Sequence, residues 1–354
     1  MGSLKAFIAL SLGLAALAAA CGGSAGTAPP TATGVPGATP GTDYASLRGD
    51  ITIDGSSTVF PITEAVSEEF GKLTKGNVKV TVGISGTGGG FKKFCNGETL
   101  ISDASRPISS SEVDACAKAG IEYIELPVAI DGLTVVVNPQ NKFLSCIKVS
   151  ELKRIWEPAA EGKITRWTQV NPAWPDAPIR LYGPGTDSGT FDYFTEVING
   201  KAKASRGDYT ASENDNVLVQ GVVGDRNALG YFGYAYYVEN KGLLKEVAID
   251  NEKGKGCMLP TDETIHKGDY APLARPLFIY VRKDAATRPH VQEFVRFYLS
   301  VPGRELVQEV GYTPFPTTVY SLTLSRFENG KLGTLFGGAA PQQGTVEEVL
   351  KGNQ

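Results

Sequence analysis

The sequence is poor in the residue types that many catalytic and nucleic-acid-binding sites need. Its 354 residues include only two histidines, both in polar stretches, and the formal net charge at pH 7 is −4. A chain without a basic cluster lacks the positive surface that attracts nucleic-acid phosphates. Cysteine and histidine spacings typical of zinc sites are also missing, so we expect no metal site and no nucleic-acid partner.

Several cofactor and nucleophile motifs are missing as well. No G-x-G-x-x-G opens a helix, no G-x-x-x-x-G-K-[ST] occurs, and no G-x-S-x-G nucleophile elbow appears. Dinucleotide, P-loop and α/β-hydrolase sites are therefore not supported. No obvious base accompanies Ser57 or Ser188, the serines that could act as nucleophiles. We expect no cofactor and no enzymatic activity. An exported phosphatase that uses one of these serines is the alternative from another class.

Glycine, in contrast, is abundant, with 42 of 354 residues, or about 12% where ~7% is usual. Hydrophobic residues make up 42% and charged residues 20%, which is a globular composition. The length predicts about two domains. Excess glycine indicates places where the backbone turns sharply or closely approaches another group.

The first 20 residues have the pattern of a secretory signal peptide. Lys5 precedes an uncharged apolar run, Ala6–Ala20, which is shorter than the ~20 residues of a membrane span. A short membrane anchor helix is the alternative. The sequence Ala18-Ala19-Ala20-Cys21 resembles a bacterial lipoprotein signal, although Ala18 stands where leucine is usual. This resemblance implies that Cys21 is lipidated and that the protein is held at a membrane outside the cytoplasm.

A tether follows the predicted lipidation site. Residues 22–42 contain six glycines and four prolines, with no charge and no aromatic residue. Such a segment cannot bury enough apolar surface to fold, and we assign residues 21–48 to the lipidated cysteine and its flexible tether. Removal of residues 1–20 would also remove the single cation Lys5 and change the net charge from −4 to −5.

Four further cysteines agree with export. An even number in an exported chain predicts two disulfides, and three pairings are possible. We favour Cys95–Cys116, which lie in one segment, and Cys146–Cys257, which bracket the middle of the chain. Free buried thiols are the alternative.

The remainder alternates strand-like and helical patterns, which predicts an α/β fold. No internal repeat is visible, and parts of the glycine-rich tail after Tyr320 are expected to be loose. The predicted strands are residues 51–53, 78–82, 133–137, 179–182 and 277–281, and the predicted helices are residues 61–73, 91–95, 149–156, 190–198, 291–299 and 304–310.

Three loops share one design: each runs from a predicted strand into a predicted helix and is rich in glycine and hydroxyl groups. Free N–H groups at a helix start, glycines that allow close approach and hydroxyl donors together suit an oxyanion. Neutral donors of this kind also need no positive net charge. Helix capping alone would explain any one loop, but three such loops favour a shared anion site. The loops are residues 55–61, 83–90 and 183–190.

These loops resemble the phosphate-binding proteins of ABC importers, the PstS family, in its SphX-like branch. The resemblance runs in order from about Gly49 to Tyr320. It implies a two-lobed periplasmic-binding-protein fold of type II, with a strand hinge and phosphate held between the lobes. The matching segments are Asp54–Ala65, Gly83–Cys95, Asp103–Ile108, Asp131–Leu133 and Tyr182–Phe191.

The resemblance also implies boundaries, partners and a role. Lobe 1 would comprise residues 49–131 and 270–325, lobe 2 residues 132–269, and the C-terminal tail residues 326–354. The protein would be a monomer that captures inorganic phosphate and delivers it to the permease and ATPase subunits of an ABC importer. Another oxyanion, such as sulfate, molybdate or tungstate, is an alternative ligand.

Site residues are carried over by position. In the first loop the resemblance implies Ser57, Thr58 and Val59, and in the second it implies Thr87 with Ser85 also plausible. In the third loop it implies Ser188, Gly189 and Thr190.

Two departures from the family pattern concern charge. Arg106 stands where many members have an aspartate that accepts the proton of hydrogen phosphate, and Pro184 stands where many have an arginine. We expect Arg106 to supply the missing positive donor, because a guanidinium binds phosphate in bidentate fashion. Asp131, near the hinge, would be the replacement proton acceptor. A surface salt bridge for Arg106 and a turn role for Asp131 are the alternatives.

Overall fold

The computed structural model describes residues 42–186, 188–212, 214–337 and 345–353. The predicted signal peptide, Cys21 and the tether up to residue 41 lie outside the described residues. Among the described helices, none combines the length and the apolar character needed to cross a bilayer.

One sheet runs through both lobes, with strand order β2-β1-β3-β12-β4-β8-β6-β7 and β9 paired to β4. In lobe 1, β1 pairs in parallel with β2 and β3, whereas β12 lies antiparallel between β3 and β4. The lobe 1 strands are β1 (Gly49–Gly55), β2 (Val78–Ile84), β3 (Ile101–Ala104) and β12 (Ala274–Arg282), together with the first part of β4 (Tyr123–Val137).

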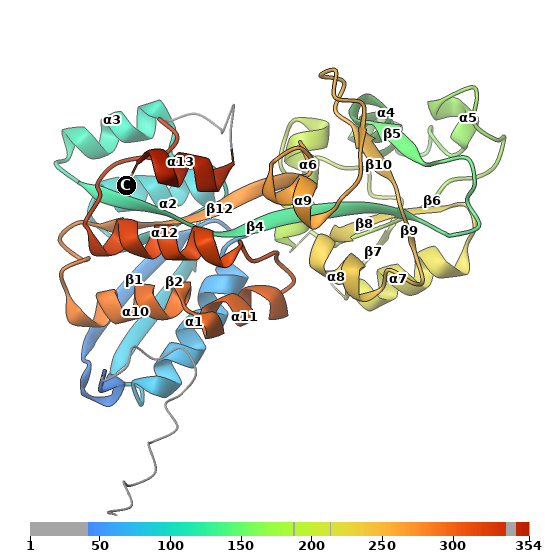
Figure 1. Cartoon of the computed structure of the whole chain (residues 1–354). Helices are drawn as coiled ribbons and strands as arrows, with labels where there is room; N and C mark the ends of the chain where they lie inside the picture. The colour runs from blue at the N-terminus through green and yellow to red at the C-terminus, as the bar shows by residue number, and fades with distance from the viewer. Residues whose placement is uncertain (1–41, 187, 213, 338–344, 354) are drawn as a thin grey trace, which may run out of the picture. The chain divides into compact units, whose positions relative to one another are not determined.

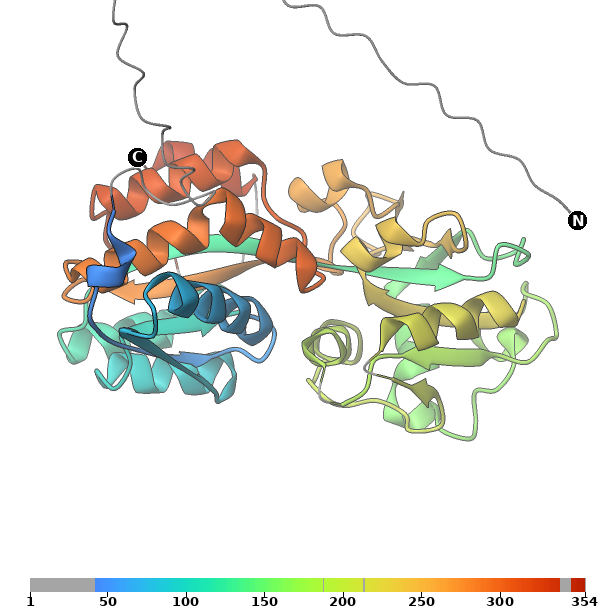
Figure 2. The ribbon, with the colours of Figure 1, turned by 90° about the horizontal axis from the view of Figure 1, so that it is seen from below.

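Helices cover both faces of the lobe 1 sheet. Figure 2 shows the orange and red helices α10 to α13 on one face and the teal helices α2 and α3 on the other. Apolar residues of α1, among them Ile62, Val66 and Phe70, are fully buried in the core. The helices are α1 (Phe60–Leu73), α2 (Gly86–Cys95), α3 (Ser110–Lys118), α10 (Pro289–Leu299), α11 (Val301–Glu309), α12 (Thr317–Glu328) and α13 (Val346–Gly352).

Lobe 2 continues the sheet from the second part of β4. There β4 pairs antiparallel with β8 and β9, and β8 pairs in parallel with β6. Strands β11, β10 and β5 form a separate three-stranded sheet in the order β11-β10-β5. The strands are β5 (Cys146–Lys148), β6 (Arg180–Gly183), β7 (Thr210–Ala211), β8 (Ala228–Gly233), β9 (Lys245–Glu246), β10 (Ala248–Asp250) and β11 (Cys257–Met258).

An aromatic cluster holds helix α6 against the sheet of lobe 2. Phe194 of α6 stacks on Tyr231 of β8 with ring centroids 3.7 Å apart, and Trp156 meets both rings edge-on. Stacking and edge contacts of this kind add to the burial of large apolar surfaces. The lobe 2 helices are α4 (Val149–Trp156), α5 (Trp167–Val170), α6 (Gly189–Asn199), α7 (Asp215–Gly224), α8 (Tyr234–Glu239) and α9 (Asp262–His266).

Strand β4 connects the lobes (Figure 1). All of its residues are buried, as expected for a strand covered on both faces. Gly132 is the last residue paired with β12, and Leu133 is the first paired with β8. The proposed lobe boundary, between residues 131 and 132, lies one residue before the point where β4 exchanges β12 for β8 as its partner.

Both favoured disulfides are confirmed. Cys95 of α2 is bonded to Cys116 of α3, and Cys146 of β5 is bonded to Cys257 of β11. The first pair lies within lobe 1 and the second within lobe 2, so neither crosslink joins one lobe to the other.

Three predicted boundaries differ from the structure. The tether was expected to reach residue 48, but Tyr44 is buried and meets Phe70 edge-on. Helix α2 begins at Gly86 rather than Phe91, because its glycines pack closely on β1 and on the adjoining loop. The proposed tail boundary at residue 326 falls inside α12, where Arg326 is buried and donates to the Glu125 carbonyl.

Candidate functional site

The first loop is shaped by a glycine that no other residue can replace. Gly55 has φ 154° and lies so close to the Asp103 backbone that a side chain would overlap it. Ser56 N–H then donates to the Asp103 carbonyl (3.0 Å), and Thr58 N–H donates to the Ser56 hydroxyl (3.2 Å). These bonds hold Ser57 and Thr58 in place just before α1 begins.

The second loop lies beside the first. A Cβ on Gly90 would come within 2.5 Å of Gly55 Cα, so α2 can approach β1 only because both positions are glycine. Thr87, in the first turn of α2, accepts from Ser105 N–H at 3.1 Å and lies 3.0 Å from the Ser105 hydroxyl. This contact places the end of β3 beside the second loop.

The third loop, from lobe 2, meets the first. A Cβ on Gly189 would lie 2.7 Å from Thr58 Cα, and the Thr58 hydroxyl is 3.5 Å from the Gly189 carbonyl. The Ser188 hydroxyl accepts from Thr190 N–H at 3.2 Å and so caps α6. Three loops from distant parts of the sequence therefore converge, as expected.

A cavity of about 260 Å³ lies at this convergence. Its lining is rich in hydroxyls and glycines and contains two arginines and two carboxylates, drawn from both lobes. The lining residues are Ser56, Ser57, Thr58, Gly86, Thr87, Gly88, Ser105, Arg106, Asp192, Glu196, Ala202 and Arg275.

The predicted site residues divide into two sets. Ser57, Thr58, Thr87 and Arg106 line the cavity. The others do not: Val59, Ser85, Asp131, Ser188, Gly189 and Thr190 lie outside its lining.

Local contacts explain two of these outside positions. Val59 is fully buried, and the Ser85 hydroxyl donates to the Asp54 carboxylate. Asp54 also holds Lys93 in an ion pair with a 2.6 Å separation. Ser85 is therefore turned toward β1, and its hydroxyl is engaged there.

Arg106 lines the cavity but is already paired. Both of its terminal nitrogens donate to the Glu112 carboxylate, at 2.8 and 2.9 Å, and this hydrogen-bonded carboxylate raises the pKa of Arg106. Glu112 also accepts from the Ser109 N–H and hydroxyl at the start of α3. The contacts of Arg106 are thus those of a surface salt bridge, the alternative given above. Its side chain is 41% exposed.

Arg275 is the site residue that the sequence analysis missed. It lies in β12, and its Nη2 is 3.2 Å from the Thr58 hydroxyl and 3.5 Å from the Asp131 carboxylate. Its guanidinium carbon lies 3.6 Å from the ring centroid of Tyr193, and its Nη1 is 3.4 Å from Glu196. One side chain near the hinge therefore contacts both lobes.

The buried Asp131 carboxylate lies beside the Arg275 guanidinium. Its side chain is 2% exposed, and Arg275 is its hydrogen-bond partner. Burial raises the pKa of Asp131 to about 6, and the opposing effect of Arg275 is smaller. The geometry gives Asp131 the position of a carboxylate that orients Arg275, outside the cavity lining.

Asp192 is a second residue that sequence reasoning missed. It lies in the first turn of α6, lines the cavity, and accepts a hydrogen bond from the Ser57 hydroxyl at 3.2 Å across the lobes. The signal for it was weak, since Asp192 follows the Ser-Gly-Thr loop by two residues and resembles an ordinary first-turn acid.

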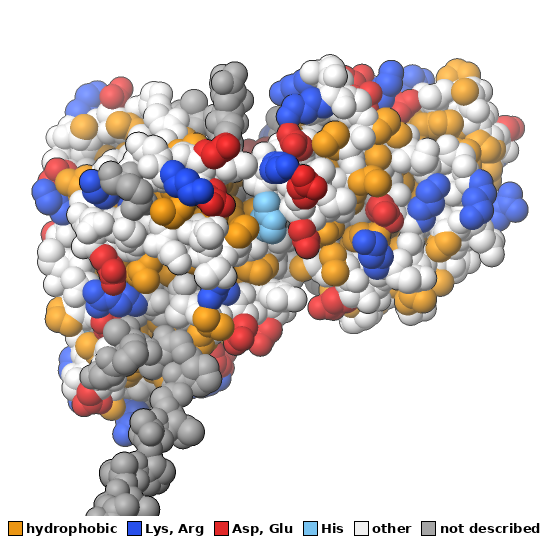
Figure 3. Space-filling model, viewed as in Figure 1, with side chains coloured by type: hydrophobic (Ala, Val, Ile, Leu, Met, Phe, Trp, Pro, Cys, Tyr) orange, Lys and Arg blue, Asp and Glu red, His pale blue; other side chains and the backbone are white. Residues whose placement is uncertain are grey.

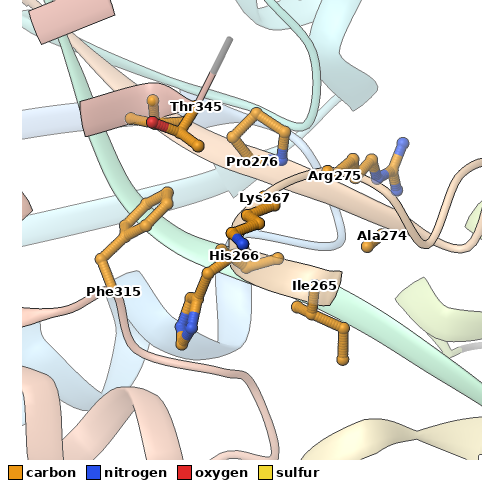
Figure 4. A pocket seen from close by; sticks show the side chains of 11 residues that line it. Ile265, His266, Lys267, Ala274, Arg275, Pro276, Phe315 and Thr345 are labelled. Carbon is orange, nitrogen blue, oxygen red and sulfur yellow. The ribbon is translucent and has the colours of Figure 1, made fainter. Parts of the chain in front are cut away.

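A second cavity, of about 50 Å³, is lined mainly by Ile130, Ile265, His266, Phe315 and the start of α13. Arg275 contributes to both cavities, and Figure 4 shows its guanidinium extending away from His266 and Phe315. The charged end of Arg275 therefore belongs to the larger cavity.

Comparisons with known proteins agree with this architecture. A family model described as a PBP superfamily domain matches residues 31–301. Protein SphX from Synechococcus elongatus is 53% identical over 309 residues, which cover 87% of this chain and 90% of that protein. Phosphate-binding protein PstS from Staphylococcus saprophyticus is 37% identical over 332 residues, covering 93% and 95%.

Solved structures give the same result. The crystal structure of a possible phosphate binding protein from Planctomyces limnophilus has a TM-score of 0.78 and 54% identity, covering 80% of this chain and 99% of that one. An ABC-type phosphate transport receptor from Vibrio cholerae, at 24% identity and a TM-score of 0.56, shares the fold.

The fold and the cavity between its lobes define a two-lobed solute-binding protein. The chain belongs to the PBP superfamily and, within it, to the family that contains SphX and PstS.

Proposed function

We propose that this protein captures inorganic phosphate between its two lobes outside the cytoplasm and delivers it to an ABC importer. The observation that carries the proposal is the cavity in which hydroxyls of both helix-opening loops of lobe 1 meet Arg275. The similarity to the phosphate-binding protein PstS of Staphylococcus saprophyticus and to the possible phosphate binding protein of Planctomyces limnophilus supports the same ligand.

The donors suit a tetrahedral oxyanion. Thr58, Thr87 and Ser57 supply hydroxyls, while the starts of α1 and α2 supply backbone N–H groups at the positive ends of helix dipoles. Arg275 supplies a guanidinium whose planar fork matches two oxygens. Most of these donors are therefore uncharged groups. On the molecular surface, Figure 3 shows positive and negative side chains interspersed over the viewed face.

Capture would proceed by closure of the lobes. Donors from both lobes meet one ligand, so phosphate stabilises the arrangement in which the lobes are together. The strand β4 would serve as hinge, and Gly132 lies where its partner changes. The ligand residues of the proposal are Ser57, Thr58, Thr87, Arg106 and Arg275, with Val59, Ser85, Ser188, Gly189 and Thr190 shaping the loops around them.

The remaining parts of the role rest on the sequence. Lipidation at Cys21 would hold the body at a membrane, and the permease and ATPase of the importer would be its partners. The protein would act as a monomer and carry out no bond-making step. A p-nitrophenyl phosphate assay with added divalent metals checks the last point, since robust turnover would contradict it.

Titration calorimetry tests the binding function directly. Protein stripped of ligand is titrated with phosphate, and separately with sulfate and molybdate. We expect one phosphate per chain and much weaker binding of the other two anions. Tighter binding of sulfate or molybdate than of phosphate, or no phosphate binding, would refute the proposal.

A further inference from the structure

The guanidinium of Arg275 lines the cavity, yet no carboxylate of the described residues pairs with it at short range. Its Nη2 lies 3.5 Å from Asp131, and its Nη1 lies 3.4 Å from Glu196. Both distances exceed the upper end of ordinary N–H···O bonds, about 3.2 Å. Within the described part of the chain, the buried Nε has no hydrogen-bond partner. Arg275 therefore keeps donor capacity, and these carboxylates alone do not fix its plane.

The aromatic ring of Tyr193 covers one face of this guanidinium. The guanidinium carbon lies 3.6 Å from the ring centroid, well inside the ~6 Å limit of a cation–π contact. Tyr193 is 1% exposed and the Arg275 side chain is 16% exposed, so little water screens the contact. A guanidinium that lies over a ring contacts it through its face, so its in-plane N–H groups remain available.

Tyr193 is itself held in place at both ends. It lies in the middle of α6, and its hydroxyl donates to the Pro272 carbonyl at 2.6 Å. Pro272 precedes Arg275 by three positions, so one short segment contacts both the hydroxyl and the face of the same ring. The packing of α6 against this segment therefore sets where the guanidinium lies.

We propose that Tyr193 is a positioning residue of the phosphate site, whose ring holds the Arg275 guanidinium with its terminal nitrogens toward the cavity. The inference rests on the proposed function. Those nitrogens lie beside Thr58 and Glu196, which both line the cavity. Tyr193 is outside the cavity lining, so it acts through Arg275.

The two arginines of the cavity differ in what orients them. Glu112 occupies both terminal nitrogens of Arg106, at 2.8 and 2.9 Å, and so takes up the donors that a phosphate would need. A ring at the face of a guanidinium takes up no donor and adds no negative charge beside an anion. Support from Tyr193 therefore leaves the planar fork of Arg275 available for two phosphate oxygens.

Titration calorimetry with phosphate, on protein stripped of ligand, compares three variants of α6. Tyr193→Leu removes the ring, Tyr193→Phe removes only the hydroxyl, and the matched control Phe194→Leu removes a neighbouring buried ring that stacks on Tyr231. We expect the phosphate Kd to rise at least about fivefold in Tyr193→Leu and to stay within about threefold of wild type in the other two.

A double-mutant cycle distinguishes positioning from general damage to α6. Arg275→Lys keeps the charge but has no planar fork for the ring to orient. In that background, Tyr193→Leu should change the phosphate Kd by less than about twofold. Structural damage alone would weaken binding by the same factor in both backgrounds.

Three results would overturn the assignment: a smaller rise in Tyr193→Leu, an equal loss in Tyr193→Phe or Phe194→Leu, or a loss that persists in the Arg275→Lys background. Circular dichroism and thermal unfolding verify that each variant is folded, and Tyr193→Met replaces Tyr193→Leu if the latter is not. Absence of phosphate binding by the wild-type protein would instead refute the proposed function, so the two failures are distinguishable.

Discussion

At the scale of the residue, the site depends on side chains that reach it from distant parts of the sequence. Arg275 and Thr58 are separated by 217 positions in the chain, yet they are 3.2 Å apart. Arg275 sits in a strand among apolar residues, and the sequence around it carries no loop or motif that marks a ligand. The family resemblance implied Thr58 and Thr87, which lie in glycine-rich loops, but nothing in the sequence indicated a cation that tertiary packing brings to the site.

The first prediction distinguishes the two arginines. Arg275→Lys keeps the charge but loses the planar fork whose Nη2 contacts Thr58 and Asp131 and whose Nη1 contacts Glu196. We expect the phosphate Kd to rise at least about tenfold, or ~1.4 kcal/mol. Arg106→Lys should cost less, because Glu112 already occupies both terminal nitrogens of Arg106. Calorimetric Kd values check this order, and a larger loss in Arg106→Lys would reverse the assignment of the main cation.

At the scale of the element, glycines determine how closely a helix approaches a strand. Strand–loop–helix alternation predicted α1, α4 and α6 nearly as they are, because apolar periodicity, the proline at the start of α1 and the Ser188 cap of α6 are local signals. The start of α2 was wrong by five residues. A run of glycine has low intrinsic helix propensity, and only its packing on β1 makes those residues helical.

A substitution in α2 tests this packing. Gly90→Ala would place a methyl group 2.5 Å from Gly55 Cα and 2.9 Å from the Asp54 carbonyl, so backbone must move. We expect a loss of about 2 kcal/mol in the free energy of unfolding, with weaker phosphate binding as the first loop shifts. Gly71→Ala in α1 is the control, since nothing lies within 4 Å of its added Cβ. Its stability should rise by ~0.5–1 kcal/mol, and equal stability of both variants would contradict the packing argument.

At the scale of the whole molecule, the two-lobed fold and both disulfides could be predicted, whereas the burial of two residues outside the predicted lobes could not. Tyr44 and Arg326 lie in segments whose composition indicated a tether and a tail, yet both are buried. Their burial depends on partners such as Phe70 and Glu125, which come from elsewhere in the chain. Long-range contacts of this kind leave no periodic signal in the sequence.

The pH dependence of global stability is set in part by one buried acid. Burial raises the pKa of Asp103 to about 8, and the nearby Asp54 adds to the shift. The folded state therefore holds this proton more tightly than the unfolded chain. The resulting stabilisation is complete below about pH 4 and is lost as the pH rises through about 8.

Asp103→Asn mimics the protonated acid and should remove this dependence. We expect the variant to gain on wild type by a few kcal/mol between pH 5 and pH 8. Urea denaturation at each pH measures the difference, with the exposed Asp114→Asn as control. A gap between Asp103→Asn and wild type that stays constant with pH would disprove the role of Asp103.

The position of β12 also constrains the order in which the molecule can be assembled. This strand inserts between β3 and β4, yet it is residues 274–282, which follow every strand of lobe 2 in the sequence. A chain delivered from its N-terminus, by a ribosome or through a membrane pore, presents all the strands of lobe 2 before the central strand of lobe 1 arrives. Until then β3 and β4 have open edges that invite wrong pairing. Lobe 1, which begins first, is therefore the last to be completed.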